Sequence, residues 1–312
     1  MVQVSLPGKV YQCVPGFESH LQAELRRAGV GFSAMGRLLY VPEPGPEPVF
    51  WHLNSWLRPF RLEFGSIGDA ATALRGIQRN WAAVLDGCFR RGTLIASKLP
   101  PIGGKPRPFP WLPGTSPMGA WTLLDEHTLV ASPACSSPFP AGVVEFVQDR
   151  EGPPSRAYLK LWEALVRLGQ WPKAGESCLD AGSSPGGWTW ALAGLGAKVL
   201  SVDRSPLDTA IAGLPEVTFA RRDAFSLLPE EVGRLDWLFC DVACYPPKLY
   251  RWILKWLESG LCRRFVCTVK MQGSGPESLD FETPKLLAGI PGSSLVHLWH
   301  NKHELTWMYP AD

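Results

Sequence analysis

Short apolar runs alternate with amphipathic helical periods over the second half of the chain. The runs predict strands, one ending at Asp180 and others over 198–203, 217–219, 237–240 and 265–269, with a closing pair over 295–299 and 305–309. Helical periods lie at about 155–168, from 186, over 247–258 and at about 276–288. Strands that alternate with helices form a parallel sheet covered on both faces, and the closing pair adds one antiparallel strand. The pattern predicts an α/β, Rossmann-like domain over residues 154–312.

The first 97 residues show shorter and more mixed signals. Residues 10–14 and 38–41 are typical of strands, and residues 18–28 have the spacing of an amphipathic helix that Gly29 ends. A second helical period covers residues 70–89. We expect a smaller α+β region over residues 1–97.

A high proline content distinguishes residues 98–153 from the regions before and after them. Pro, Gly and Ser crowd positions 100–117, which excludes a regular element there and predicts a linker or a rigid loop packed against a neighbour. Cationic and aromatic side chains interleave in this stretch, at Lys98, Lys105, Arg107, Phe109 and Trp111. They could form a surface that faces nucleic acid, and a solvated proline-rich loop is the alternative.

Composition limits the class of protein. The chain has 312 residues, 46% hydrophobic and 19% charged, so it is long enough for two domains with full cores. We find no window near the ~18 uncharged apolar residues of a membrane span, and the first residues lack the pattern of a signal peptide. The eight cysteines include no C-x-x-C pair, which predicts free thiols in a reducing, cytoplasmic compartment. A net charge of +2 neither supports nor excludes an RNA partner.

A glycine-rich turn follows the strand that ends at Asp180. It reads Asp-Ala-Gly-Ser-Ser-Pro-Gly-Gly-Trp over residues 180–188, and its glycines allow the backbone to approach a ligand closely. The spacing differs from the G-x-G-x-x-G of dinucleotide sites, because only Gly182 and the pair at 186–187 are available. The next strand ends at Asp203, in the position that takes ribose hydroxyls in nucleotide-binding βαβ units.

Further charged residues fall at the ends of predicted strands. The set is Asp180, Asp203, Asp241 and Lys270, with Glu304 at the start of the antiparallel strand. These positions all lie at one edge of the sheet, outside which the ligands of open parallel sheets bind. A single acid here often only caps the following helix, but the joint placement of four carboxylates and a lysine favours a functional crevice.

These segments resemble the FtsJ-like family of ribose 2′-O-methyltransferases. The matching segments, in the family's order, are residues 154–161, the glycine turn, Cys240–Asp241, 268–270 and 303–306. The resemblance covers residues 154–312 well and the remainder in patches, and it is strongest to the branch that methylates a cytidine of 23S, large-subunit rRNA. It implies the Rossmann-like fold of class I methyltransferases that depend on S-adenosylmethionine. It also implies that residues 1–97 present the RNA, as a reduced counterpart of a THUMP-containing segment.

The family's Lys-Asp-Lys-Glu tetrad corresponds to Lys160, Asp241, Lys270 and Glu304. The resemblance implies S-adenosyl-L-methionine as the cofactor and no metal. Its implied contacts are Asp180, Gly182, Ser184, Pro185, Gly186, Gly187, Trp188, Asp203, Asp223 and Asp241. We expect Lys270 to act as the base, which requires that its pKa falls from about 10.4 toward about 7–8. Partial burial beside a second cation would lower it in this way.

Other functions stay open at this point. The chain could be an inactive homologue that binds RNA, a methyltransferase of another RNA, or a small-molecule O-methyltransferase. Residues 182–186 also match the G-x-S-x-G of α/β-hydrolases with Ser184 as nucleophile, but Pro185 has no N–H for the oxyanion hole. Three histidines between residues 297 and 303 suggest a metal site, yet residues three apart on a strand face opposite sides, which favours a structural role.

Overall fold

The computed structural model describes residues 1–45, 48–103, 105–262, 264–271, 273 and 275–310. The chain divides into two compact units. Unit 1 comprises Met1–Arg107 and Pro113–Glu145, and unit 2 comprises Pro108–Leu112 and Phe146–Asp312. These boundaries differ from the expected ones at residues 97 and 153, because the segment expected to be a linker or loop contributes to both units. None of the helices in the described part of the chain is long and apolar enough to cross a membrane.

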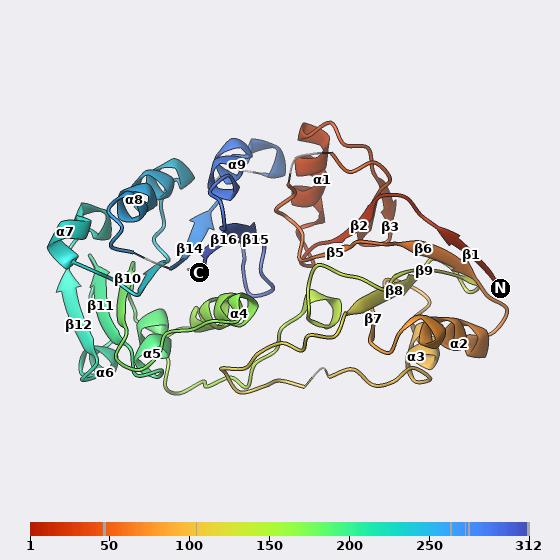
Figure 1. The fold of residues 1–312 in the computed structure, drawn as a ribbon, viewed down its shortest axis with the longest axis horizontal. Coiled ribbons are helices and arrows are strands. Elements are labelled where there is room, and N and C mark those ends of the chain that lie inside the picture. The colour runs from red at the N-terminus through yellow and green to blue at the C-terminus, as the bar shows by residue number, and fades with distance from the viewer. Residues whose placement is uncertain (46–47, 104, 263, 272, 274, 311–312) are drawn as a thin grey trace. The chain divides into compact units, whose positions relative to one another are not determined.

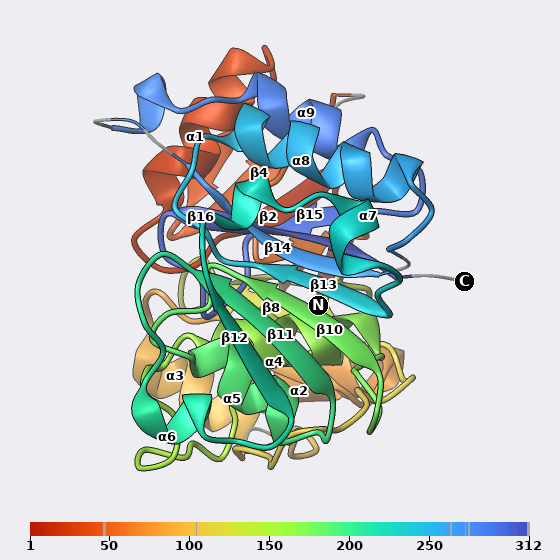
Figure 2. The same cartoon turned by 90° about the vertical axis from the view of Figure 1, so that its left-hand side faces the viewer.

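Within the described residues, unit 2 is built on one seven-stranded sheet (Figures 1 and 2). Its strand order is β12-β11-β10-β13-β14-β16-β15. The bounds are β10 Ser177–Ala181, β11 Lys198–Asp203, β12 Val217–Arg221, β13 Trp237–Cys240, β14 Phe265–Lys270, β15 Ser294–Val296 and β16 Glu304–Tyr309. Neighbouring strands pair in parallel except β16, which runs antiparallel to β14 and β15. The expected Rossmann-like sheet with one antiparallel strand is confirmed.

Helices cover both faces of this sheet. They are α4 Tyr158–Leu168, α5 Gly187–Ala193, α6 Thr209–Ala212, α7 Pro229–Val232, α8 Pro246–Glu258 and α9 Glu282–Ala288. In Figures 1 and 2, α8 and α9 lie on one face, and α4 and α5 lie on the other. Because both faces are covered, the central strands read as nearly continuous apolar runs. The helix expected at about 276–288 begins only at Glu282, where Asp280 caps it by accepting two backbone N–H groups.

Unit 1 mixes helices and strands, as expected. The order of its five-stranded sheet is β1 Val2–Ser5, β6 Phe60–Glu63, β9 Thr128–Ser132, β8 Gly119–Leu123 and β7 Trp81–Ala83. The order of its four-stranded sheet is β3 Ser33–Met35, β4 Leu38–Val41, β2 Lys9–Gln12 and β5 Asn54–Trp56. The helices are α1 Glu18–Arg27, α2 Ile67–Ile77 and α3 Phe89–Ala96.

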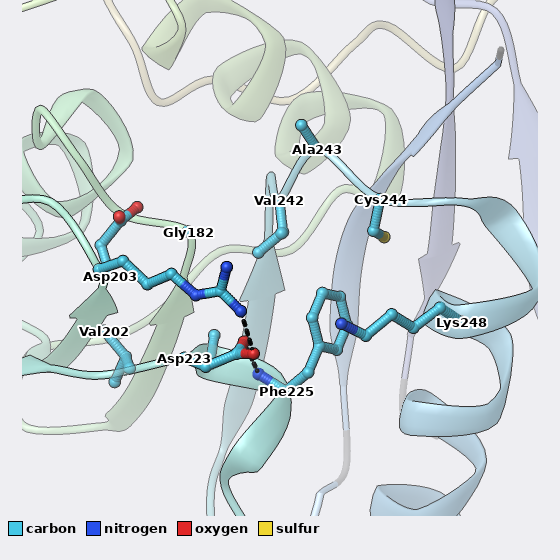
Figure 3. Close-up of a pocket in the computed structure, with 11 residues that line it drawn as sticks. Gly182, Val202, Asp203, Asp223, Phe225, Val242, Ala243, Cys244 and Lys248 are labelled. Carbon is cyan, nitrogen blue, oxygen red and sulfur yellow. Dashed lines mark hydrogen bonds and ion pairs between the residues drawn. The ribbon is translucent and has the colours of Figure 1, made fainter.

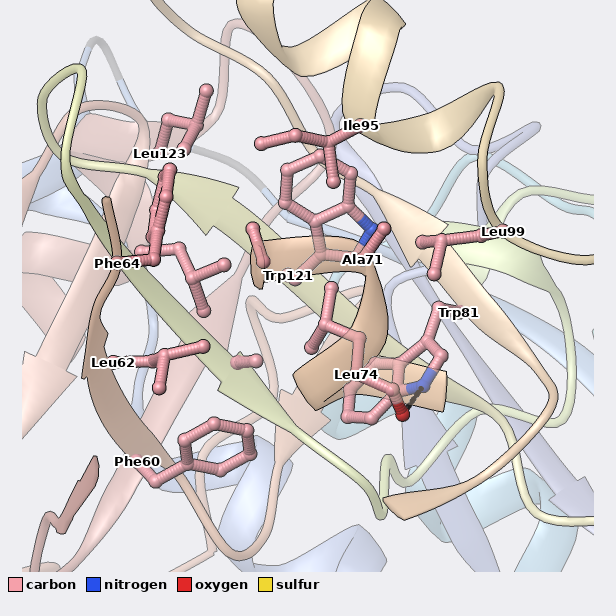
Figure 4. Close-up of a cluster of buried hydrophobic side chains, with 13 residues drawn as sticks. Phe60, Leu62, Phe64, Ala71, Leu74, Trp81, Ile95, Leu99, Trp121 and Leu123 are labelled. Carbon is pink, nitrogen blue, oxygen red and sulfur yellow. Dashed lines mark hydrogen bonds between the residues drawn. The ribbon is translucent and has the colours of Figure 1, made fainter. Parts of the chain in front are cut away.

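A cluster of large apolar side chains joins the five-stranded sheet of unit 1 to α2 and α3 (Figure 4). Phe60 and Leu62 come from β6, Leu74 from α2 and Ile95 from α3. The indole N–H of Trp81 donates to the Leu74 carbonyl at 2.8 Å, which satisfies a polar group that burial would otherwise leave without a partner. This core belongs to unit 1 alone.

Residues 70–89 do not form the single helix that their period predicted. A capping box of Ser66 and Asp69 starts α2 earlier, and the helix ends at Ile77. Trp81 then begins β7, whose partner β8 lies in a distant segment that local periodicity cannot reveal. Both β8 and β9 lie in the stretch expected to be a linker or loop. Every residue of these two strands is buried, so neither strand shows an alternating pattern.

Candidate active site

Four charged side chains of unit 2 form a closed square of ion pairs. The Lys160 ammonium lies 2.9 Å from Asp241 Oδ2 and 3.0 Å from Glu304 Oε1. The Lys270 ammonium lies 2.6 Å from Asp241 Oδ1 and 3.0 Å from Glu304 Oε2. Each lysine therefore contacts both carboxylates, and each contact uses a different oxygen. The structure brings together all four residues of the expected tetrad.

The sheet and one helix place these side chains. Lys270 ends β14 and Glu304 begins β16, and the antiparallel register sets the two residues directly opposite each other. Asp241 follows β13, and Lys160 lies in the first turn of α4. The Thr268 hydroxyl donates to Asp241 from the same face of β14 as Lys270, because strand residues two apart point to one side. The sequence reasoning missed Thr268, although this spacing could have suggested it.

The charges in the square set the pKa values of its members. Burial opposes the charge of Asp241, but Lys160 and Lys270 outweigh that effect and hold its pKa below the usual value. The pKa of Glu304 is lowered for the same reasons. Burial also opposes the charge of Lys270, but Asp241 and Glu304 outweigh it, so the pKa of Lys270 is raised. The expectation that this pKa falls toward neutrality is wrong for this arrangement, because two carboxylates face the ammonium.

A pocket adjoins the square at the carboxyl ends of the parallel strands (Figure 3). Residues at the ends of four strands line the pocket. They are Gly182 after β10, Asp203 at the end of β11, Asp223 after β12, and residues 242–244, which follow Asp241 after β13. Asp241 itself is not part of the lining. This is the edge at which open parallel sheets bind ligands. The cavity has a volume of about 140 Å³, below the roughly 300–1,000 Å³ of most ligand sites.

Two glycines of the turn pack closely against neighbouring segments of the chain. Gly182 has φ +80°, and a Cβ there would meet Val242 Cγ2 at 2.6 Å and the Val242 backbone at 3.0 Å. Gly186 has φ +120°, and a Cβ there would meet Ile211 at 3.0 Å. Only glycine satisfies both the left-handed conformation and the close approach. These close contacts are with the chain's own atoms, so the approach of the turn to a ligand stays a prediction.

Asp203 shapes the turn as well as lining the pocket. Its Oδ2 accepts the Ser184 backbone N–H at 3.1 Å, and its Oδ1 accepts the Ser205 N–H at 2.8 Å. Each carboxylate oxygen keeps a further lone pair, so Asp203 can still accept a hydroxyl from a ribose. The Ser184 hydroxyl donates to the Pro206 carbonyl at 2.8 Å rather than to a histidine, which removes the geometric basis of a hydrolase nucleophile.

Asp223 is already engaged in an ion pair at the pocket wall. It pairs with Arg204 and also accepts the Phe225 backbone N–H at 3.0 Å. Burial would raise the pKa of Asp223, but the hydrogen bonds from Arg204 and the Phe225 N–H, together with the charges of Arg204 and Lys248, outweigh that effect and lower it. Arg204 lines the pocket too, and its side chain is 73% exposed and therefore able to move. If Arg204 left Asp223, this carboxylate would be able to accept further hydrogen bonds.

Seven expected cofactor contacts lie outside the pocket lining: Asp180, Ser184, Pro185, Gly186, Gly187, Trp188 and Asp241. Asp180 is fully buried and accepts the Thr189 hydroxyl at 2.6 Å. The Trp188 indole N–H donates to the Ala157 carbonyl at 2.9 Å, which ties α5 to the start of α4. Gly187 allows close packing, since a Cβ there would meet the Ser155 hydroxyl at 2.4 Å. In the structure Asp180, Gly187 and Trp188 support the turn.

The comparison with protein families agrees with this geometry. Residues 153–266 match the FtsJ-like methyltransferase family. Unit 2 contains an FtsJ-like methyltransferase domain. Lys160 and Asp241 lie inside the matched range, whereas Lys270 and Glu304 follow it. S-adenosylmethionine is the cofactor of this domain family, and the pocket lies where the family's fold would bind it.

Curated relatives extend the match beyond the FtsJ-like domain. Ribosomal RNA large subunit methyltransferase M of Halorhodospira halophila is 34% identical over 172 residues, covering 54% of this chain and 50% of that protein. The protein of the same name from Laribacter hongkongensis is 33% identical over 190 residues, covering 57% and 53%. The chain therefore spans about half the length of the curated relatives it matches.

A solved structure with a similar fold is the 1,6-didemethyltoxoflavin-N1-methyltransferase of Burkholderia thailandensis. It is 20% identical to this chain, and the alignment covers 46% of this chain and 72% of that one with a TM-score of 0.34. A score this low carries no argument about ligand or activity. The fold of the FtsJ-like domain rests instead on its own strand order.

The histidines near the C-terminus contact other groups of the same domain. His300 Nδ1 lies 2.8 Å from Glu163, and His297 Nε2 lies 3.0 Å from the Lys302 carbonyl. β15 ends at Val296, so these residues lie in a loop and not on the strand that the sequence predicted. Among the described residues, no group of three or more His, Cys, Asp or Glu side chains is placed to hold a metal ion.

Proposed function

We propose that this chain transfers a methyl group from S-adenosylmethionine to the 2′ hydroxyl of a cytidine in large-subunit rRNA, in the cytoplasm. The observation that supports the reaction most is the square of Lys160, Asp241, Lys270 and Glu304 beside the pocket of an FtsJ-like domain. The names of the relatives support the choice of RNA. Residues 1–97, as a reduced THUMP-like region, would present that RNA.

The tetrad suits the chemical difficulty of this reaction. A ribose hydroxyl is a poor nucleophile, so the protein has to orient it and remove its proton. Asp241 and Glu304 hold two ammonium groups in fixed positions, from which N–H donors can orient the hydroxyl. Lys270 must be neutral when it accepts the proton, although the two carboxylates raise its pKa.

For Lys270 to act as the base, its ammonium group must first lose a proton. S-adenosylmethionine, when bound, supplies the methyl group on a positively charged sulfur. A like charge near an ammonium lowers its pKa, so a cation in the pocket opposes the two carboxylates. Asp203 and Asp223 would hold the adenosine part, Gly182 and Gly186 would allow the backbone to approach it, and Asp241 links this pocket to the tetrad.

The direct test measures methyl transfer from radiolabelled S-adenosylmethionine into unmodified large-subunit rRNA, followed by digestion to nucleosides. The wild type should yield 2′-O-methylcytidine, and Lys270→Ala should lose at least about 100-fold in rate, in the range of general-base catalysis, while it still binds the cofactor. Lys198→Ala, at the exposed amino end of β11, is the matched lysine control and should behave as the wild type. A methylated base, a different nucleoside, or tight cofactor binding without any transfer by the wild type would reject the proposal.

A further inference from the structure

The exposed face of α8 carries an aromatic side chain and three cations. Tyr245 precedes the helix, and Lys248, Arg251 and Lys255 follow at helical spacing, opposite the buried Leu249, Trp252, Ile253 and Trp256. Tyr245 is 67% exposed, so its ring is accessible for stacking. No ion pair joins these three cations to a carboxylate in the described part of the chain, and all three residues are exposed.

A cavity of about 610 Å³ opens at the start of this face. Tyr245, Lys248 and Arg251 line it on the α8 side, and Leu279 and Asp280 line it on the side of α9. Asp280 is the one carboxylate of this lining, and its Oδ1 is held by the N–H groups that start α9. The lining thus combines a stacking surface with two cations.

The cavity shares one lining residue with the pocket of the FtsJ-like domain. Lys248 lines both, and its ammonium lies 4.4 Å from the centre of the Phe225 ring on the pocket side (Figure 3). Asp241 of the tetrad and Tyr245 are four residues apart, so their Cα atoms lie within about 14 Å even in an extended chain. A ligand strand with its reacting group at the tetrad would extend over this face.

We propose that Tyr245, Lys248 and Arg251 bind the RNA strand next to the target nucleotide. Tyr245 stacks on a neighbouring base, and Arg251 and Lys248 contact the phosphates on either side. Exposed aromatic residues beside cations are the usual means of holding single-stranded nucleic acid without reading its sequence. This inference rests on the proposed function, because it assigns the strand to an RNA substrate.

Binding of RNA tests the inference separately from catalysis. The probe is a fluorescein-labelled, single-stranded, cytidine-rich RNA dodecamer, and anisotropy gives its Kd for the full chain. Tyr245→Ala and Arg251→Glu should each weaken binding by roughly tenfold or more, in the range of one lost stacking or phosphate contact. Arg251→Ala should also reduce the salt slope by about 0.7. Arg234→Ala, an exposed arginine outside both cavities, is the control and should leave the Kd unchanged.

Methyl transfer then separates this inference from the proposed function. With rRNA as substrate, Tyr245→Ala and Arg251→Glu should raise KM about tenfold, while kcat and the affinity for S-adenosylmethionine stay within about twofold of the wild type. A wild type that binds the dodecamer through these residues but transfers no methyl group would reject the proposed function alone. An unchanged Kd in Tyr245→Ala and Arg251→Glu would overturn the inference while transfer persists. A wild type that does not bind the dodecamer would overturn it as well.

Discussion

Lys270 lies between two carboxylates, and this placement determines the pH at which it can accept a proton. Burial favours the neutral amine, but Asp241 and Glu304 raise the pKa above the ordinary value of a lysine. Below that pKa, the neutral fraction grows about tenfold for each unit of pH. We therefore expect the single-turnover rate at saturating cofactor to rise steadily from pH 6.5 to pH 9. A flat profile would show that Lys270 is not the base.

Lys270→Arg provides the matched control for this pH dependence. Arginine keeps the positive charge opposite Asp241 and Glu304 but does not lose its proton in proteins. The variant should bind the cofactor and keep its melting temperature within a few degrees, yet show almost no transfer at any pH. Substantial activity in Lys270→Arg would mean that the residue only orients the hydroxyl.

Asp180 gives a second prediction at the residue scale. Burial is the main cause that raises the pKa of Asp180 to about 7, although the hydrogen bond from the Thr189 hydroxyl acts to lower it. The other carboxylate oxygen, Oδ1, has no hydrogen-bond partner. A carboxyl group with a raised folded-state pKa stabilises the fold fully below about pH 4, and this contribution is lost as the pH rises to 7. Asp180→Asn removes that loss, so its stability relative to the wild type should increase between pH 4 and pH 7 by up to about 4 kcal/mol.

Chemical denaturation at pH 5 and pH 8 measures this effect. The free energy of unfolding of Asp180→Asn, relative to that of the wild type, should be higher at pH 8 than at pH 5. Asp236→Asn is a suitable control, because Asp236 accepts the Ser177 backbone N–H at 2.9 Å but is only partly buried. If the free energy of unfolding of Asp180→Asn relative to the wild type were the same at both pH values, Asp180 would not be a buried carboxyl group that titrates in this range.

At the scale of elements, Glu163 joins α4 to the loop that leads into β16. It is fully buried, and its two oxygens accept the backbone N–H groups of Trp299 and His300 at 3.0 and 2.9 Å. Burial would raise the pKa of Glu163, but Arg167 and His300 outweigh that effect and lower it. Lys160 lies one turn before Glu163, so the same helix positions both a tetrad lysine and the approach to Glu304.

Glu163→Gln should therefore weaken both stability and activity. It removes the buried carboxylate charge that lies 2.9 Å from Arg167, and the loss should be about 3–5 kcal/mol in the free energy of unfolding. Methyl transfer should fall even where the variant remains folded, because Glu304 loses its support. Glu231→Gln, which breaks an exposed pair with Arg222, is the control and should cost less than about 1 kcal/mol. Similar losses in the two variants would contradict the special role of Glu163.

The predictability of each element followed from where its contacts lie. The strands of unit 2 are apolar runs of three to six residues, most of them separated by helices, so their sequence along the chain could be inferred from local pattern, and β11 and β13 have the predicted bounds. The strands of unit 1 are three to five residues long and pair with distant partners, as β6 does with β1 and β9. Local periodicity carries no signal for such pairing, and β7 was therefore absorbed into an expected helix.

The candidate site was predictable to a different extent. Strand ends and the resemblance to the FtsJ-like family were sufficient to select the four tetrad residues that the structure brings together. The direction of the Lys270 pKa shift was not, because it depends on how far the two carboxylates outweigh burial. The Arg204–Asp223 pair and the contact of Phe225 with Lys248 were also missed, since each joins side chains that lie about 20 residues apart in the sequence.

At the scale of the whole molecule, the chain passes between the two units three times. Pro108–Leu112 belongs to unit 2, although unit 1 contains the segments on both sides of it. Phe109 stacks on Trp162 of α4 with ring centres 4.9 Å apart and also contacts Phe146 edge to face. The proline-rich stretch thus uses Phe109 for packing and not as an exposed nucleic-acid contact.

Phe109→Ala should destabilise unit 2 selectively. The ring is half-buried, so its loss should lower the free energy of unfolding by about 1–3 kcal/mol, less than for a fully buried phenylalanine. Hydrogen exchange should show weaker protection of amides in α4 and β10, while β6 and β9 in unit 1 keep theirs. Leu112→Ala, in the same segment but 61% exposed, is the control and should change stability by less than about 0.5 kcal/mol. Equal loss of protection in both units would mean that they unfold together and that the segment does not stabilise unit 2 alone.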